Sequence, residues 1–168
     1  SGMAYLAPIN DPGILYSVHY SEPWNYTAKT PNKGRYSYPD EMPAYWNGPG
    51  ESWTIENLRE RMEPVLAWAT EHSIPPSRIV AAEFGCSREV SGASAYLRDV
   101  IALLNQRGYH WAFYSYREDV WDGMDYELGT EPLKWNQRYW DKSDQGVYVP
   151  KAWHDNPLFQ IIKEELVR

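Results

Sequence analysis

Cysteines, runs of basic residues and long apolar stretches are scarce or missing in this sequence, and each absence excludes a class of protein. A single cysteine, Cys86, cannot form an internal disulfide and leaves no cysteine-rich metal pattern. The four histidines are scattered and show no HExxH or similar spacing. We therefore expect no structural metal and no metal among the site residues.

The charge balance is acidic, with 16 Lys and Arg against 23 Asp and Glu, a net charge of −7 and a pI near 5.1. Nucleic acids and anionic membrane surfaces both require basic patches, so neither is expected as a partner and the substrate is expected to be neutral. There is no apolar run of about 18 residues and no charged segment followed by one. The sequence thus predicts neither a transmembrane helix nor a signal peptide, and localisation stays open.

Aromatic residues are abundant instead, with nine Trp and fourteen Tyr against three Phe. Trp and Tyr combine an apolar face with a polar edge, which suits stacking on a hydroxyl-rich ligand such as a sugar ring. The competing interpretation is that most of these residues fill a core and long loops.

The length fits one domain over residues 1–168, built of alternating strands and helices. We expect strands at 13–20, 79–84 and 110–115, and helices at 55–72, 92–107 and 158–166. Long aromatic loops cover 21–53 and 117–155. This order predicts a parallel sheet with right-handed crossovers, in which the loops after the strands form the ligand-binding edge.

Three residues predict where helices begin, break or end. Thr54 is a candidate N-cap, Pro64 should kink or divide the helix that follows, and Gly108 is a candidate C-cap.

The segment 79–85 reads IVAAEFG, an apolar run followed by a carboxylate and a glycine. The run suits a strand buried on both faces, and it delivers Glu83 to the strand's C-terminal end, where (β/α)8 barrels carry their catalytic groups. Glu83 could instead cap the next helix or pair with Arg88. Other polar candidates at or near strand ends are His19, Tyr20 and Tyr114.

Three segments together resemble glycoside hydrolase family 5, the cellulase family. They are 18–27 (VHYSEPWNYT), 81–85 (AAEFG) and 111–119 (WAFYSYRED), the last followed by 121–127 (WDGMDYE). The resemblance covers almost the whole chain but only the C-terminal part of the barrel. It implies an α/β fold that is a partial (β/α)8 TIM barrel of about three βα units, strands 6 to 8, with long aromatic loops.

The resemblance also implies roles for individual residues. Glu83 matches the nucleophile of a retaining β-glycosidase, and His19 matches the histidine near that nucleophile. Without the resemblance, His19 would be read as a hydrogen-bonded core histidine. No cofactor is implied. The residues expected to bind substrate are Tyr20, Tyr114, Trp24 and Trp121.

The sequence departs from the family pattern at two positions. The sixth strand of the family usually reads His-x-Tyr, whereas Ser21 stands at the third position here and the tyrosine is Tyr20. The eighth strand usually supplies a Trp under the sugar, and the matching residue is Tyr114. Tyrosine offers a smaller stacking surface.

Retaining hydrolysis needs a second carboxyl group roughly 5–5.5 Å from the first. The family supplies it from an Asn-Glu-Pro sequence on a strand that this chain does not contain. Glu22, in the superficially similar sequence 21–23, is a weak substitute, and a solvated loop residue is the alternative interpretation. The acid/base carboxylate is therefore expected from a missing N-terminal part or a partner chain.

The expected function is that of an endoglucanase-like retaining β-glycosidase that hydrolyses O-glycosidic bonds of a β-linked polysaccharide. The alternatives are a non-catalytic carbohydrate-binding or assembly module and an inert fragment. Unpaired strand edges invite association, so an N-terminal barrel part or a homo-oligomer is expected to cover them. The family resemblance favours a secreted or periplasmic location.

Overall fold

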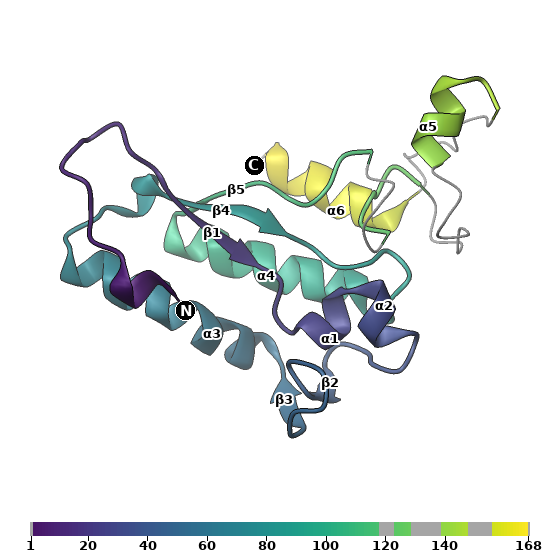
Figure 1. The fold of residues 1–168 in the computed structure, drawn as a ribbon, viewed down its shortest axis with the longest axis horizontal. Helices are drawn as coiled ribbons and strands as arrows, with labels where there is room; N and C mark the ends of the chain where they lie inside the picture. Colours follow the sequence, from purple (N-terminus) through teal and green to yellow (C-terminus); the bar gives the residue numbers. More distant parts are fainter. Residues whose placement is uncertain (1, 118–122, 129–138, 148–155, 168) are drawn as a thin grey trace.

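The structure is a computed structural model that describes residues 2–117, 123–128, 139–147 and 156–167. Its centre is a three-stranded parallel sheet, in which β4 lies between the two other strands (Figure 1). The strands are β1 (Tyr16–Tyr20), β4 (Ile79–Phe84) and β5 (His110–Trp111). The parallel α/β arrangement expected from the sequence is confirmed.

Three helices alternate with these strands and follow them in the chain. They are α3 (Ile55–Glu71), α4 (Ala93–Arg107) and α6 (Pro157–Leu166). Helix α4 contacts both α3 and α6. Among the described residues no helix is long and apolar enough to cross a bilayer.

The remaining described elements are short. The loop expected over 21–53 contains two small helices and an antiparallel hairpin, so it is more structured than the sequence suggested. These elements are α1 (Trp24–Thr27), α2 (Lys29–Asn32), β2 (Asp40–Met42) and β3 (Glu51–Trp53). Elsewhere lie the 3-10 helices η1 (Gly2–Tyr5) and η2 (Pro76–Arg78), and the helix α5 (Tyr139–Asp144).

Helix α3 begins where the sequence predicted but is not divided. Thr54 is its N-cap, and the Thr54 N–H donates to Asn57 Oδ1 at 3.2 Å. The helix continues past Pro64 to Glu71, so the expectation of two shorter helices was wrong. Packing of its apolar face, which includes the buried Leu58 and Met62, stabilises the continuous helix despite the lost donor.

Two further expectations concern the ends of elements. Gly108 is the C-cap of α4 with φ +68°, which confirms that prediction. The third strand was expected to reach residue 115, but β5 ends at Trp111. Its backbone nevertheless stays beside β4, because the Ala112 N–H donates to Ala81 O at 2.9 Å and the Tyr114 N–H donates to Phe84 O at 2.7 Å.

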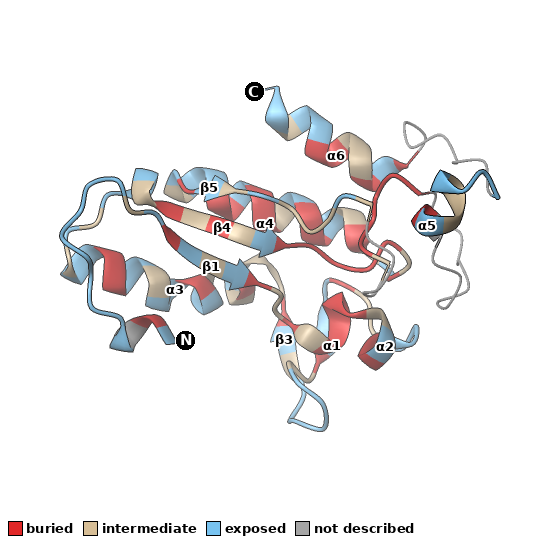
Figure 2. Cartoon of the chain, turned by 45° about the horizontal axis from the view of Figure 1, so that its top comes forward, coloured by how far each residue is buried: buried red, intermediate tan, exposed pale blue. Residues whose placement is uncertain are grey.

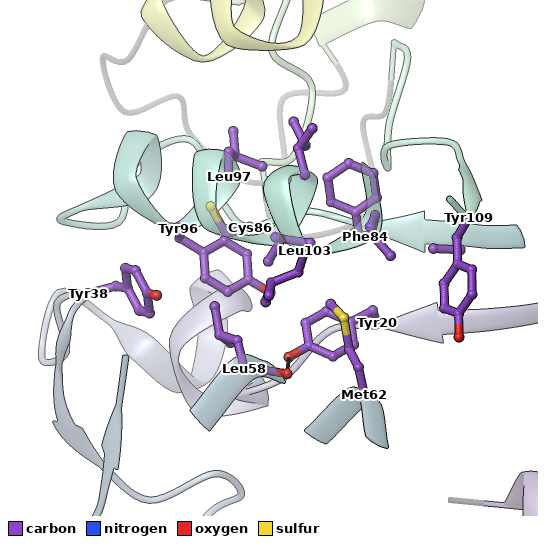
Figure 3. Packing of buried hydrophobic residues seen from close by; sticks show 14 of the residues in the cluster. Tyr20, Tyr38, Leu58, Met62, Phe84, Cys86, Tyr96, Leu97, Leu103 and Tyr109 are labelled. Carbon is purple, nitrogen blue, oxygen red and sulfur yellow. Dashed lines mark hydrogen bonds between the residues drawn. The ribbon is translucent and has the colours of Figure 1, made fainter. Parts of the chain in front are cut away.

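Tyrosines fill much of the core, and several of them form hydrogen bonds there through their hydroxyl groups (Figure 3). Tyr26 donates to Ser91 O at 3.0 Å, Tyr38 to Asp99 Oδ2 at 2.6 Å and Tyr96 to Glu22 O at 2.8 Å. Burial raises the pKa of the Tyr96 hydroxyl well above its usual value. Part of the tyrosine excess is therefore structural, as the competing interpretation held.

The sheet has one packed face and one open face. On β1, Tyr16 and Tyr20 are buried, whereas Ser17 and His19 are exposed (Figure 2). On β4, Val80 is half-buried. The strand is therefore not buried on both faces, contrary to the reading of its apolar run.

Candidate active site

The site is built at the C-terminal ends of β1 and β4, which are adjacent parallel strands. His19 and Glu83 are register partners on the open face of the sheet. His19 Nδ1 lies 3.4 Å from Glu83 Oε2, and the two side chains are 61% and 48% exposed. The histidine and the carboxylate that were predicted separately thus form a pair.

A β-bulge at Ala82 places Glu83 on this face. Val18 pairs with Ala81, but the next residue, His19, pairs with Glu83, so Ala82 is an extra residue in β4. In a regular strand Glu83 would lie on the same face as Ala81, which is buried in the core, because side chains alternate with a period of two. The extra residue turns the carboxylate outward, a common role of bulges beside functional sites.

A pocket of about 290 Å³ opens beside this pair. The described residues that line it are His19, Ser21, Trp24, Glu83, Phe84, Gly85, Tyr114 and Met124. Glu83 is the single carboxylic acid among them. The pocket lining combines one carboxylate, one imidazole and three aromatic residues, Trp24, Phe84 and Tyr114.

The predicted Trp24 and Tyr114 both reach this pocket. Trp24 is the first residue of α1, which follows β1 after the short segment 21–23, and Tyr114 lies beyond the end of β5. The Tyr114–Ser115 peptide bond is cis. These two rings come from opposite sides of β4, as the predicted cleft at the sheet edge requires.

Tyr20 is not brought to the pocket. It follows His19 in β1, and consecutive strand residues point to opposite faces of the sheet. Its side chain is buried beside Leu58 and Met62, and the hydroxyl donates to Leu58 O at 2.9 Å (Figure 3). Trp121, the remaining predicted substrate-binding residue, lies outside the described residues.

Ser21, Phe84, Gly85 and Met124 line the pocket but were not predicted as site residues. Ser21 stands where the family pattern has its tyrosine, so this departure from the pattern could have marked Ser21 as a site residue. Nothing in the sequence marks Met124 in this way. Its carbonyl oxygen accepts a hydrogen bond from the Ser115 N–H at 3.1 Å, which folds residues 123–128 back onto the Tyr114 segment.

Gly85 allows the backbone segments around the pocket to approach closely. Its φ is +151°, and an added Cβ atom would lie 2.6 Å from Tyr114 O and 2.9 Å from Tyr126 Oη. Only glycine fits such an approach without a shift of backbone. The residue therefore fixes how the β4 exit packs against the Tyr114 segment.

Tyr126 contacts both of these segments. Its buried hydroxyl accepts from the Cys86 N–H and donates to Cys86 O, both at 2.9 Å. Its ring stacks on Phe113, with centroids 5.7 Å apart and an interplanar angle of 10°. Phe113 and Cys86 each lie next to a pocket residue, so Tyr126 is a positioning residue for the pocket.

The alternative pairing of Glu83 with Arg88 is not found. Arg88 is buried, and its Nε lies 3.3 Å from Asp125 Oδ1, which belongs to the loop after β5. Trp140 Nε1 donates to the other Asp125 oxygen at 2.9 Å. Arg88 therefore links the loop after β4 to the loop after β5, while Glu83 faces His19.

Glu22, the weak candidate for the second carboxylate, does not line the His19–Glu83 pocket. It borders a separate cavity of about 600 Å³, which His19 also borders. Glu22 Oε1 accepts a hydrogen bond from the Tyr45 hydroxyl at 2.5 Å. Burial and this carboxylate raise the pKa of Tyr45 to about 12. Within the described part of the chain, no group of three or more His, Cys, Asp or Glu residues could hold a metal ion.

The comparisons with known proteins find solved structures of similar fold but no family model or curated protein that matches the sequence. Among solved structures, an endoglucanase superposes with a TM-score of 0.54 at 24% identity, over 78% of this chain and 41% of that chain. The endoglucanase Cel5A from Thermotoga maritima gives a TM-score of 0.55 at 18% identity, over 84% of this chain and 43% of that chain.

A second structure of Thermotoga maritima Cel5A, in complex with cellobiose, gives a TM-score of 0.56 at 16% identity. It is matched over 84% of this chain and 43% of its own. At such identities the likeness concerns the fold alone. The chain spans about two fifths of the length of these structures, and its mixed α/β fold resembles that of TIM-barrel endoglucanases.

Proposed function

We propose that this chain is a single domain forming the C-terminal part of a family 5 retaining β-glycosidase of the endoglucanase type. Its substrate is a β-linked polysaccharide. The observation that carries the proposal is the His19–Glu83 pair, 3.4 Å apart at adjacent strand exits and turned outward by the bulge. The likeness to endoglucanases in fold supports the same reading.

Glu83 acts as the nucleophile in this proposal. Its carboxylate attacks the anomeric carbon while the leaving glycosidic oxygen takes a proton from an acid group, which gives a glycosyl ester of Glu83. Water then attacks the same carbon, loses a proton to the conjugate base and releases Glu83. His19, facing Oε2, orients the carboxylate, and Trp24 and Tyr114 stack on sugar rings.

The acid/base group comes from outside the described pocket, because Glu83 is the single carboxylic acid among the described lining residues. Further strands of a barrel, either upstream in a longer polypeptide or in a partner chain, supply it. Two features support this assignment. The three-stranded sheet leaves β1 and β5 as edge strands, and the matched endoglucanases are more than twice as long as the matched region.

The test is hydrolysis of an aryl β-cellobioside by the complete assembly and by its Glu83→Gln variant. Glutamine keeps the shape of the side chain but cannot form the ester, so turnover should fall by several orders of magnitude. Glu71→Gln, an exposed substitution at the end of α3, should change nothing. Unchanged turnover in Glu83→Gln would remove Glu83 from this role.

A second candidate function is a non-catalytic carbohydrate-binding or assembly module. The lone carboxylate among aromatic rings favours it, since stacking needs no second carboxyl group. Calorimetric binding of a glucan without turnover, by a chain established as full length, would decide for this function.

A further inference from the structure

The loop between β2 and β3 carries two exposed aromatic side chains outside the His19–Glu83 pocket. Tyr45 is 51% exposed and Trp46 is 69% exposed. We call them the Tyr45–Trp46 platform. The loop projects beside α1 and is largely exposed along its length (Figures 1 and 2). Exposed loop tips with large apolar rings need an explanation, because small polar residues usually occupy such positions.

The platform is anchored by a buried side chain. Asn25 is 2% exposed, and its Oδ1 accepts from the Trp46 N–H while its Nδ2 donates to Trp46 O, both at 2.8 Å. The Asn25 N–H donates to Ala44 O at 3.0 Å. The Tyr45 hydroxyl is held by Glu22. Hydrogen bonds on both sides of the two rings thus fix the backbone that presents them.

These hydrogen bonds maintain an energetically unfavourable backbone conformation at Trp46. Trp46 has φ +42°, in the left-handed region that bulky residues rarely adopt. Such strain persists only where surrounding contacts over-determine it, and it is concentrated at functional sites. A ring held rigidly in place also loses less conformational entropy on binding than a free loop would.

We propose that the Tyr45–Trp46 platform is a second carbohydrate subsite, which binds a sugar ring of the same β-linked chain outside the pocket. This inference rests on the proposed function. The platform and the pocket are connected through α1, because Asn25, the anchor, directly follows Trp24, which lines the pocket. A chain of several sugars could therefore contact both surfaces, whereas a disaccharide in the pocket could not.

The surroundings of the platform favour a neutral ligand. The flanking strands carry Asp40, Glu41 and Glu51, which would repel nucleic acids and acidic glycans. Trp and Tyr offer flat apolar faces with polar edges, which match the face and rim of a neutral sugar ring.

The test is calorimetric titration of the 168-residue chain with cellobiose and with cellohexaose. Trp46→Ala should weaken cellohexaose binding by roughly tenfold and leave cellobiose binding unchanged. Asn25→Ala, which keeps the ring but releases its anchor, should weaken cellohexaose binding to a smaller extent. The matched control is Tyr5→Ala, which removes an aromatic ring that is 92% exposed on η1 and should alter neither affinity.

The outcomes separate the two proposals. If the chain binds both sugars and Trp46→Ala binds cellohexaose as tightly as the unchanged chain, only the platform is refuted. If the unchanged chain binds neither sugar, the carbohydrate function fails, and the platform with it. Altered sedimentation of Trp46→Ala without altered sugar affinity would assign this surface to a protein partner and overturn the inference.

Discussion

At the scale of single residues, the pocket depends on packing and hydrogen bonds behind its lining side chains. Tyr126 holds Cys86 through two hydrogen bonds and Phe113 through ring stacking. Gly85 leaves room for the carbonyl group of Tyr114. The residues that line the pocket are thus positioned by their neighbours, so substitutions of these neighbours should change sugar binding as well as stability.

Tyr126→Phe keeps the stacked ring and removes the hydroxyl that serves both Cys86 backbone groups. Leaving these buried groups without partners should lower the free energy of unfolding by about 1–3 kcal/mol. It should also weaken cellohexaose binding, because Gly85 lines the pocket beside Cys86. Chemical denaturation and calorimetry measure the two effects. Tyr116→Phe, on an exposed ring, is the control, and equal sugar affinity in both variants would contradict the positioning role.

Gly85→Ala introduces a methyl group where the carbonyl oxygen of Tyr114 lies. Gly146→Ala is the matched control, because that glycine also has a positive φ, +74°, but nothing lies within 4 Å of its added Cβ. In both variants the alanine is strained by the positive φ. Only Gly85→Ala also brings a Cβ atom against the carbonyl oxygen of Tyr114. We expect Gly85→Ala to be less stable than the control by about 1–3 kcal/mol in urea denaturation. Equal stabilities of the two variants would show that the Tyr114 segment shifts to accommodate the methyl group without a cost in free energy.

Glu127 gives a prediction about pH. Burial raises the pKa of this carboxyl group above its usual value, so the folded chain binds the proton more tightly than the unfolded chain does. The contribution of Glu127 to stability therefore falls as the pH rises through the interval between the two pKa values. Glu127→Gln should melt at a higher temperature than the unchanged chain at pH 7, and the difference should vanish below about pH 4.

Scanning calorimetry at several pH values measures this difference. A conservative control is Glu164→Gln on α6, whose carboxylate is largely exposed and should give no pH-dependent difference. A loss of stability in Glu127→Gln that is the same at every pH would instead show that the carboxylate makes contacts which the amide cannot replace.

At the scale of elements, the bulge in β4 decides which face of the sheet carries the site. Strand β1 keeps a regular alternation, and β4 would place its carboxylate in the core if it did the same. The bulge, which accommodates Ala82 as an extra residue, therefore keeps Glu83 opposite His19 on the open face.

Deleting Ala82 should remove the bulge and restore regular pairing, with Glu83 still opposite His19. Glu83 would then directly follow Ala81, which faces the core, so its side chain would stay on the open face and cellohexaose binding should be retained. Ala82→Ser keeps the extra residue and is the control, with binding close to that of the unchanged chain. A folded deletion variant that no longer binds cellohexaose would show that the pocket requires the bulge itself.

The elements with local signals could be predicted from the sequence, and those set by neighbouring strands could not. Thr54 and Gly108 were found because caps depend on the residue itself. The bulge was missed because pairing register is a property of two strands, and IVAAEF has no glycine to mark it. The β2–β3 hairpin was missed because three-residue strands are too short to show alternation.

The candidate site, too, could be predicted from the sequence only in part. His19, Glu83, Trp24 and Tyr114 were predicted from their place at strand ends and from the family resemblance, and they line one pocket. Tyr20 was included although it adjoins His19 in a strand, where only one of two neighbours can face the ligand. Continuity of α3 through Pro64 depended on packing that no local pattern reveals.

At the scale of the whole molecule, the described part of the sheet has two edge strands. Strands β1 and β5 each pair with β4 alone, so each leaves one edge without a strand among the described residues. Beside β1 lies the 600 Å³ cavity, bordered by η1 and α3. Exposed strand edges of this kind template association with further strands.

We therefore expect the isolated chain to self-associate or to bind an N-terminal barrel fragment. Sedimentation velocity over a range of concentrations measures the first, and co-purification with such a fragment measures the second. Leu15→Lys, at the exposed residue directly before β1, should reduce association, because charges beside an edge strand oppose pairing. The control is Leu66→Lys on α3. A monodisperse monomer at all concentrations, with no fragment binding, would contradict this expectation.

The exposure of His19 and Glu83 links such association to chemistry. Water now reaches both side chains, and an electrostatic interaction at a fixed separation is stronger in a medium of lower dielectric constant. A surface laid over the open face of the sheet would displace that water without moving either residue. Assembly would then change the environment of the His19–Glu83 pair as well as cover the strand edges, so the two side chains would interact most strongly only in the assembled state.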